Sequence, residues 1–350
     1  MKKSQPLHPY FTSQSIDVIK KYITFFTKEG DVVLDPFCGT GTVGIAASME
    51  NRKSILFDLS PFAVFISKRS LEKINVEKTK NNFKYIKNTI SNKINETYLN
   101  EFQKKPQKYP NVIFPTSSDA KNMQELFTSR NLYNLNRLLD IINSTNDETS
   151  KKFFLFIFSG ILHRASKTFF YDKAKWGGGN SSIFTKYRYW IPKTPDERNV
   201  WELFEIRFKR VLKIKEKIQS ELKQKSSIQH GSATKLTKIK DNSVDYVYTD
   251  PPYGANIAYL DLSLMWNAWL NLDNKFKKSE EAIEGGSEHL SKENYLKIMG
   301  ESFKEIYRVL KPQKYLSLVF QHKDPKLWYD IIEQCEQQGF KYVNAFSYGS

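Results

Sequence analysis

The sequence predicts an α/β fold whose mostly parallel sheet is interrupted by a large and mostly helical insertion. Short apolar runs alternate with helical stretches over residues 1–72, and the same texture returns over residues 226–350. Between them, residues 73–225 are charged and mostly helical by pattern, with Asn- and Lys-rich loops. Because repeated strand–helix–strand units build parallel sheets, we expect one α/β domain in two parts around this insertion.

The first part contains the expected elements in the order helix, strand, helix, strand. A helix over 15–26 precedes the apolar strand 32–34. A Gly-rich turn then leads to a helix over 43–49, which is followed by the strand 54–57. Each of the two strands ends at an aspartate, and the spacing is that of a βαβ unit.

The second part is expected to complete the sheet with four more strands and two helices. Gly339 marks the end of its last helix, because glycine commonly stops helices. The strands are expected at 226–230, 245–249, 315–320 and 341–346, and the helices at 292–310 and 325–338.

The turn after the first strand is the first sign of a ligand site. It reads Asp35-Pro-Phe-Cys-Gly-Thr-Gly-Thr42, and its glycines let a ligand lie against the backbone at a helix N-terminus. Asp58 ends the next strand, where a carboxylate accepts hydrogen bonds from ribose hydroxyls. The turn lacks the lysine of a phosphate-binding loop, which argues against a nucleoside triphosphate.

The second sign is the tetrapeptide Asp250-Pro251-Pro252-Tyr253, which follows the expected buried strand 245–249. The amino group of a nucleobase is a poor nucleophile because its lone pair is delocalised into the ring. A carboxylate at Asp250 and the carbonyl of Pro251 can each accept a hydrogen bond from one N–H group of this amine. These hydrogen bonds free the lone pair for attack. Tyr253 is expected to stack on a base flipped out of its helix.

Together these two motifs resemble those of the amino-group DNA methyltransferases, which make N6-methyladenine or N4-methylcytosine. The resemblance implies the Rossmann-like sheet of class I methyltransferases and the cofactor S-adenosyl-L-methionine, without a metal. It implies that the loop residues wrap the methionine part of the cofactor and that Asp58 holds its ribose. His8-Pro-Tyr-Phe11 is similar to the family's N-terminal cofactor element. The cofactor-binding residues so implied are Pro9, Tyr10, Phe11, Asp35, Phe37, Gly39, Gly41, Thr42, Asp58 and Ser232.

Ser232 is a departure from the family pattern, because an acidic residue that binds the cofactor's adenine is expected near this position. The family's sheet also has seven strands, whereas we find six candidates. We therefore expect a sheet that is incomplete or unusually completed. The alternatives are a missing C-terminal continuation, a second protein subunit that supplies a strand, or direct pairing of the last two strands.

The charge of the chain points to a polyanionic partner, and DNA is the first candidate. Lys and Arg exceed Asp and Glu by a formal net charge of +16. Residues 163–193 are both basic and aromatic, which suits phosphates and bases, although a half-buried element with solvated lysines has the same composition. The expected nucleic-acid contacts are Arg164, Lys167, Lys175, Lys186, Arg188 and Trp190.

We therefore expect a site-specific DNA adenine-N6 methyltransferase, in a restriction–modification or phage-defence system. The resemblance favours adenine because Ser more often precedes Pro-Pro-Tyr in the cytosine-N4 enzymes. Three alternatives stay open: a cytosine-N4 enzyme, a tRNA guanine-N2 methyltransferase, which Gly254 after Tyr253 also fits, and a catalytically silent DNA-binding subunit. With two cysteines and no signal-peptide pattern, the chain is expected to be cytoplasmic and without a membrane segment.

Overall fold

The computed structural model describes seven segments of the chain. They are residues 7–10, 14–96, 110–170, 180–181, 188–255, 257–273 and 277–345.

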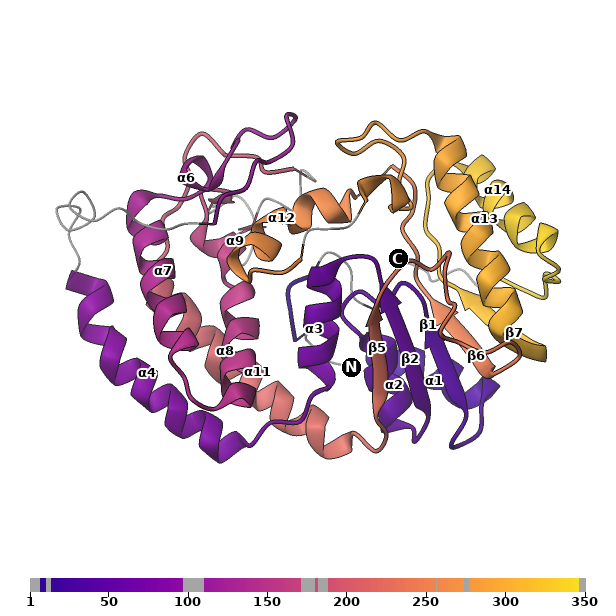
Figure 1. Ribbon diagram of the computed structural model, residues 1–350, viewed down its shortest axis with the longest axis horizontal. Helices are drawn as coiled ribbons and strands as arrows, with labels where there is room; N and C mark the ends of the chain where they lie inside the picture. Colours follow the sequence, from indigo (N-terminus) through magenta and orange to yellow (C-terminus); the bar gives the residue numbers. More distant parts are fainter. Residues whose placement is uncertain are drawn as a thin grey trace.

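A five-stranded parallel sheet forms the core of one half of the molecule, the right-hand half in Figure 1. Its strands lie in the order β5-β2-β1-β6-β7. The bounds are β1 Val32–Asp35, β2 Lys53–Asp58, β5 Ser226–His230, β6 Val244–Thr249 and β7 Leu310–Leu318.

The order of the strands reverses between β1 and β6. From β1 the chain proceeds outward to β2 and β5, and it then returns to add β6 and β7 on the other side. Parallel α/β sheets bind ligands outside the carboxyl ends of the strands at such a switch point. The turn after β1 and the tetrapeptide after β6 both lie there, so the topology alone brings the two motifs together.

Helices cover both faces of the sheet, and the alternation of side chains along β6 shows how. Tyr246 and Tyr248 share one core cluster with Ile19 and Ile23 of α1 (Ile16–Phe26) and with α2 (Thr42–Met49). Val247 points to the other face, where α13 (Lys292–Val309) and α14 (Pro325–Gln337) pack. Both faces are buried, as expected for a parallel sheet.

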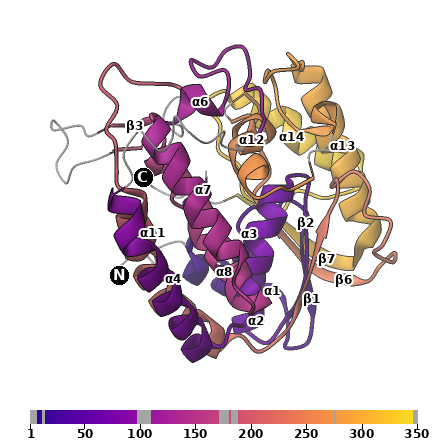
Figure 2. The same cartoon turned by 60° about the vertical axis from the view of Figure 1, so that its left-hand side comes forward.

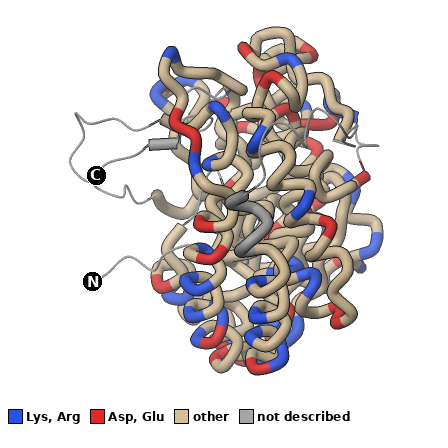
Figure 3. The backbone as a smooth tube through the Cα atoms, turned by 90° about the vertical axis from the view of Figure 1, so that its left-hand side faces the viewer, with Lys and Arg blue, Asp and Glu red and all other residues tan. Residues whose placement is uncertain are grey.

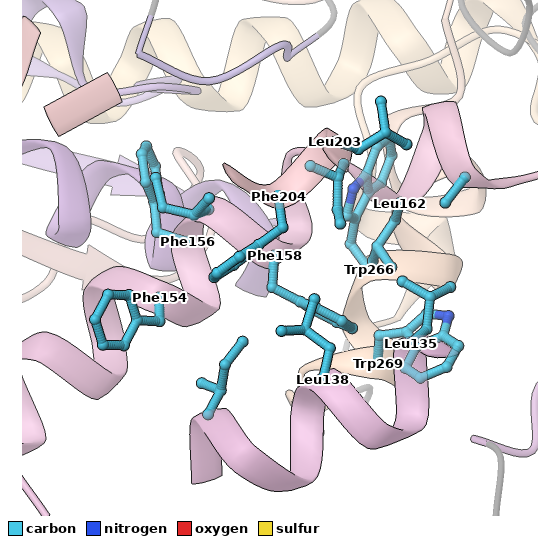
Figure 4. Packing of buried hydrophobic residues seen from close by; sticks show 14 of the residues in the cluster. Leu135, Leu138, Phe154, Phe156, Phe158, Leu162, Leu203, Phe204, Trp266 and Trp269 are labelled. Atoms are coloured by element: carbon cyan, nitrogen blue, oxygen red, sulfur yellow. The ribbon is translucent and has the colours of Figure 1, made fainter. Parts of the chain in front are cut away.

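A group of helices lies between α3 (Pro61–Leu71) and β5 in the chain, and to one side of the sheet in Figures 1 and 2. They share one apolar core with α3 and with α12 (Tyr259–Trp269), in which Phe62 stacks on Trp266 with ring centroids 4.8 Å apart. Figure 4 shows Trp266 and Trp269 among the phenylalanines and leucines of these helices. The elements are α4 Val76–Glu96, α6 Met123–Leu126, α7 Ser129–Asn143, α8 Glu148–Ser159, α9 Leu162–Ala165, β3 Phe169–Phe170, β4 Asn180–Ser181 and α11 Val200–Glu221.

The structure confirms the α/β fold and five of the six expected strands, and it differs in two respects. β7 begins at Leu310 and bulges between its pairs with Val244 and Tyr246, with Gln313 in the left-handed region. Residues 341–345 form no strand, and residue 346 is outside the described part, so the expected strand 341–346 is not observed. Among the described residues, β7 pairs with β6 alone, and direct pairing of the last two strands is not seen.

None of the described helices is long and apolar enough to cross a membrane.

Candidate active site

The turn after β1 adopts a conformation that requires its glycines. Gly39 and Gly41 have φ values of +48° and +77°, and Gly41 is the N-cap of α2. A Cβ atom at Gly41 would lie 3.0 Å from the Cβ of Ser67 and 3.2 Å from its Cα. The turn is thus folded tightly against α3, and any side chain at residue 41 would push it outward.

Asp35 lies beneath this turn and joins the ends of β1 and β6. Its Oδ1 accepts hydrogen bonds from the Thr249 hydroxyl at 2.8 Å and from the Phe37 amide at 3.1 Å. Burial raises the pKa of the Asp35 carboxyl to about 7. Asp35 is 3% exposed and is absent from the cavity wall, and its two hydrogen bonds hold the start of the loop against the end of β6.

Asp58 holds the same loop from the end of β2 and also faces a cavity. Its Oδ2 accepts a hydrogen bond from the Gly39 amide at 2.9 Å, and its Oδ1 accepts one from the Ser60 amide at 2.8 Å. Burial raises the pKa of Asp58 to about 6, although these hydrogen bonds lower it. Each carboxylate oxygen has a second lone pair, so Asp58 can still accept hydroxyl groups from a ligand.

Asp250 reaches the cavity from the end of β6. Its Oδ2 accepts a hydrogen bond from the Gln14 amide nitrogen at 2.8 Å, and its Oδ1 accepts one from the Tyr253 hydroxyl. Burial raises the pKa of the Asp250 carboxyl, and the two hydrogen bonds oppose that shift. The turn itself is fixed because the Tyr295 hydroxyl donates to the Pro252 carbonyl at 2.9 Å.

One cavity of about 680 Å³ connects Asp58 with Asp250. Its described wall contains four carboxyl groups and no Lys or Arg. A cationic ligand with apolar parts fits this wall, and a phosphate does not. The lining residues are Tyr10, Pro36, Phe37, Gly39, Asp58, Leu59, Ser60, Ser232, Ala233, Asp250, Pro252, Tyr259, Leu260, Glu280, Glu281, Ala282, Ile298 and Ser302.

Several wall residues were not expected from the sequence. Glu281 follows a short 3₁₀ helix, Lys278–Glu280, and its Oε1 accepts a hydrogen bond from the Leu260 amide at 3.1 Å at the start of α12. Burial raises the pKa of Glu281 to about 8. Tyr259 faces Tyr10 across the cavity in a stacked orientation, with centroids 6.1 Å apart. No motif marked these residues, because they lie outside both signature segments.

The structure separates the expected cofactor residues into two groups. Five of them line the cavity: Tyr10, Phe37, Gly39, Asp58 and Ser232. Pro9, Asp35, Gly41 and Thr42 are described but lie outside the wall, where Gly41 and Asp35 shape the loop. Phe11 falls outside the described residues. In the catalytic tetrapeptide Asp250 and Pro252 are in the wall, and Pro251 and Tyr253 are adjacent to it in the chain.

A second cavity, of about 580 Å³, lies between the helical group and the segment that follows the tetrapeptide. Arg188 and Ser118 line it on one side, and Ala255 and Ala258 line it on the other. Tyr189 also contributes, but it is fully buried, and its hydroxyl donates to the Leu262 carbonyl at 2.7 Å. Tyr189 therefore ties the helical group to α12 and is not free to stack on a base.

The expected nucleic-acid residues are spread over this side of the molecule. Arg164 is exposed on α9, and Trp190 packs edge-on against Phe170, with centroids 5.6 Å apart. Arg188 lies at the second cavity, and the backbone amide of Lys167 donates to the Leu126 carbonyl. Lys175 and Lys186 lie outside the described residues.

Arg164 on α9 lies near three arginines that the sequence did not single out, Arg198 just before α11 and Arg207 and Arg210 on α11. Burial, together with the neighbouring guanidinium groups of Arg198 and Arg210, lowers the pKa of Arg164. The pKa of Arg207 is lowered to about 9 for the same reasons, with Arg210 and Arg164 as its neighbours. We name Arg164, Arg198, Arg207 and Arg210 the arginine cluster. Figure 3, which looks onto the helical group, shows Lys and Arg distributed over this side and mixed with acids toward the bottom.

Comparison with known proteins decides what this arrangement belongs to. A family model described as DNA methylase matches residues 1–69 and 244–348, which include both motifs and the strands that carry them. The chain belongs to the amino-methyltransferase family of DNA methylases. Members of this family use S-adenosylmethionine as the methyl donor. That molecule carries a sulfonium and an ammonium group, so it fits the acidic and aromatic cavity wall.

Curated relatives match this chain to different extents, and M.BsoBI covers enough of it to reach into the helical group. The Type II methyltransferase M.BsoBI of Geobacillus stearothermophilus is 26% identical over 293 residues, or 78% of this chain and 54% of the relative. The Type II methyltransferase M.MjaII of Methanocaldococcus jannaschii is 23% identical over 48% of this chain and 41% of the relative. The Type II methyltransferase M.BamHI of Bacillus amyloliquefaciens is 47% identical over 49 residues, 14% of this chain and 12% of the relative. The chain thus spans about half the length of M.BsoBI and less of the others.

Proposed function

We propose that this chain methylates DNA by transferring a methyl group from S-adenosylmethionine to the exocyclic N6 of adenine. The observation that carries the proposal is a single cavity that joins Asp58 to Asp250. A cofactor whose ribose is held by Asp58 and a base whose amino group is held by Asp250 would share this cavity, so their reacting atoms would meet without a covalent enzyme intermediate.

The chemistry falls to a few groups of the chain. The cofactor supplies an electrophilic methyl group on a positively charged sulfur. Asp250 accepts a hydrogen bond from one N–H group of the base amine, and the carbonyl of Pro251 accepts a hydrogen bond from the other. The amine lone pair is thereby localised on nitrogen, and the proton released after transfer leaves through Asp250 to solvent. Tyr295 keeps the turn rigid through the Pro252 carbonyl, which holds these acceptors in place.

The choice of adenine rests on Asp250. Serine more often precedes Pro-Pro-Tyr in cytosine-N4 enzymes, and its hydroxyl accepts a hydrogen bond from an N–H group without carrying a negative charge. The carboxylate of Asp250 also attracts the proton that the amine loses. Cytosine N4 is the second candidate, because its amino group has the same geometry of donors. Analysis of the nucleosides from methylated DNA separates the two directly.

DNA contacts are proposed for the surface formed by residues 73–225, which would act as the target-recognition region. Arg164, Arg188 and Trp190 would contribute to it, together with Lys167, and with Lys175 and Lys186 outside the described residues. The arginine cluster supports this proposal, because its exposed members Arg164 and Arg210 place two guanidinium groups near each other, and such groups pair well with phosphates.

A restriction–modification role is proposed from the relatives, three of which bear the name Type II methyltransferase. A second protein subunit, or a further segment of chain, is proposed to pair with the outer edge of β7. The support is physical: an edge strand presents unpaired backbone N–H and C=O groups, and β7 has no second partner among the described strands. The mass of the chain in solution, with and without DNA, tests this part.

The experiment that tests the function uses the chain with radiolabelled S-adenosylmethionine and either random-sequence duplex DNA or tRNA. We expect label in the DNA, and N6-methyladenine after digestion to nucleosides. N4-methylcytosine in the digest would identify cytosine N4 as the target in place of adenine N6. Label in the tRNA alone would identify RNA as the substrate. Absence of transfer to both, with cofactor binding intact, would leave only a DNA-binding role.

A further inference from the structure

A chain of hydrogen bonds runs from the core of the sheet to the carboxylate of Asp250. The Tyr248 hydroxyl donates to Gln14 Oε1 at 2.6 Å, and Gln14 Nε2 donates to Asp250 Oδ2 at 2.8 Å. Tyr248 is buried against α1, where Tyr22 contacts its ring edge-on. Gln14 lies just before α1, so the first helix of the chain supports a residue that is 236 positions away in sequence.

The amide of Gln14 has one favourable orientation here. Its carbonyl oxygen can accept a hydrogen bond from the Tyr248 hydroxyl, while its NH₂ group faces the carboxylate of Asp250. The opposite orientation would place the amide oxygen against a negatively charged oxygen. The buried tyrosine and the carboxylate therefore fix the amide between them, and the amide fixes the carboxylate.

The two oxygens of Asp250 are consequently not equivalent. Oδ2 is held by Gln14, a residue outside the cavity wall, whereas Oδ1 is held by Tyr253 of the tetrapeptide itself. Tyr253 packs edge-on against Phe320 at 5.3 Å, and its hydroxyl takes up one lone pair of Oδ1, which leaves the second lone pair for an amine.

We propose that Gln14 is a positioning residue of the methylase site: it holds Oδ2 of Asp250 so that Oδ1 alone is presented to the base amine. Tyr253 holds Oδ1 through one lone pair and leaves the other lone pair for the amine. This inference rests on the function proposed above and assigns a role within that site. Gln14 acts through Asp250 and does not itself touch the reacting atoms.

The role of Gln14 predicts a change in the titration of Asp250. A hydrogen bond donated to a carboxylate stabilises its charged form, and burial already raises the pKa of Asp250. Removing the donor should raise that pKa further, so the acidic limb of activity moves to higher pH. The other titratable groups near Asp250 are Tyr10, Asp35, Asp58, Tyr248, Tyr253, Tyr259, Glu280 and Glu281, and of these only Tyr248 is changed, in one variant.

The test compares Gln14→Met and Gln14→Glu, which have nearly the same size as glutamine, with Gln229→Met on β5 as a control. For Gln14→Met we expect a loss of about tenfold in kcat and an acidic limb shifted upward by about one pH unit. Gln14→Glu should shift it further, because it places a second carboxylate beside Asp250. The KM for the cofactor should stay unchanged in these variants, and the control should behave as the wild-type chain. Tyr248→Phe should follow Gln14→Met with a smaller effect.

A direct measurement keeps the inference separate from the proposed function. The pKa of Asp250, followed by carbon NMR of ¹³C-labelled carboxyl groups, should rise in Gln14→Met whether or not the chain transfers methyl groups. An unchanged pKa, or a fall in kcat without movement of the acidic limb, would reduce Gln14 to a packing role and overturn the inference. A wild-type chain without transfer activity would refute the proposed function instead.

Discussion

At the scale of single residues, the proposed cofactor site centres on Asp58. Its carboxylate fixes the loop through the Gly39 amide and faces the cavity with its remaining lone pairs. We predict that Asp58→Ala weakens S-adenosylmethionine binding by about 1–3 kcal/mol, the cost of lost hydrogen bonds to a charged group. Calorimetric titration measures this, with the exposed Asp17→Ala on α1 as a control of equal charge change. Unchanged affinity would remove Asp58 from the site.

The pH dependence of binding follows from the same carboxyl. Burial raises the pKa of Asp58 to about 6, and a cationic ligand binds the charged form better than the protonated form. Affinity for S-adenosylmethionine should therefore fall as the pH drops below about 6, and binding at that pH should release protons. Asp58→Asn should lose this dependence. Titrations in buffers of different ionisation enthalpy measure the protons, and an equal release in the variant would contradict the assignment.

The sequence predicted the residues that stand at strand ends and missed those that arrive from elsewhere. Asp58 and Asp250 could be inferred because each directly follows an apolar strand, and parallel topology brings such positions to one edge. Gln14, Tyr259 and Glu281 could not, because their places depend on packing between distant helices. Ser232 lines the cavity as expected, even though it is not the acidic residue typical of the family.

At the scale of elements, Gly41 in the turn between β1 and α2 can be compared with Gly30, which lies just before β1. Gly30 and Gly41 both lie in the left-handed region, with φ values of +84° and +77°. An added Cβ meets nothing within 4 Å at Gly30 but lies 3.0 Å from Ser67 at Gly41. We predict that Gly30→Ala costs about 1–2 kcal/mol of stability and spares cofactor binding, whereas Gly41→Ala costs more and also weakens binding.

Chemical denaturation and calorimetry measure both effects of this glycine pair. Equal losses of stability in the two variants, with cofactor affinity intact, would show that contact with Ser67 does not shape the turn. α12 was not predicted, because it is buried on nearly all sides and shows no polar face. The expected strand 341–346 also failed, because an alternating pattern alone does not supply a pairing partner.

At the scale of the whole molecule, the helical group and the methylase sheet share a core through α3 and α12, which the division of the sequence by texture did not anticipate. Because this core is shared, a DNA-binding surface on the helical group would be held in a fixed position relative to the cavity and Asp250. If the arginine cluster contacts DNA phosphates, the double variant Arg164→Gln/Arg210→Gln should flatten the salt dependence of DNA binding by about 0.9 per lost contact.

The control for the arginine variant keeps the net charge equal. Lys80 Nζ lies 3.1 Å from Glu216 Oε1, and Lys87 Nζ lies 2.9 Å from Glu205 Oε1. The double variant Lys80→Gln/Lys87→Gln therefore removes two charges that already have acidic partners. This control should leave the slope close to that of the wild-type chain. A slope that falls equally in both double variants would indicate a general charge effect and no defined phosphate surface.

The central claim is that one cavity holds the cofactor at Asp58 and the target amine at Asp250. The measurement that tests it most directly is a single-turnover transfer of labelled methyl to duplex DNA by Asp250→Ala, with cofactor affinity determined on the same preparation. We predict that transfer is abolished while affinity stays within a few-fold of the wild-type value, because Asp250 contacts the base and Asp58 binds the ribose. Transfer that persists in Asp250→Ala would contradict the account.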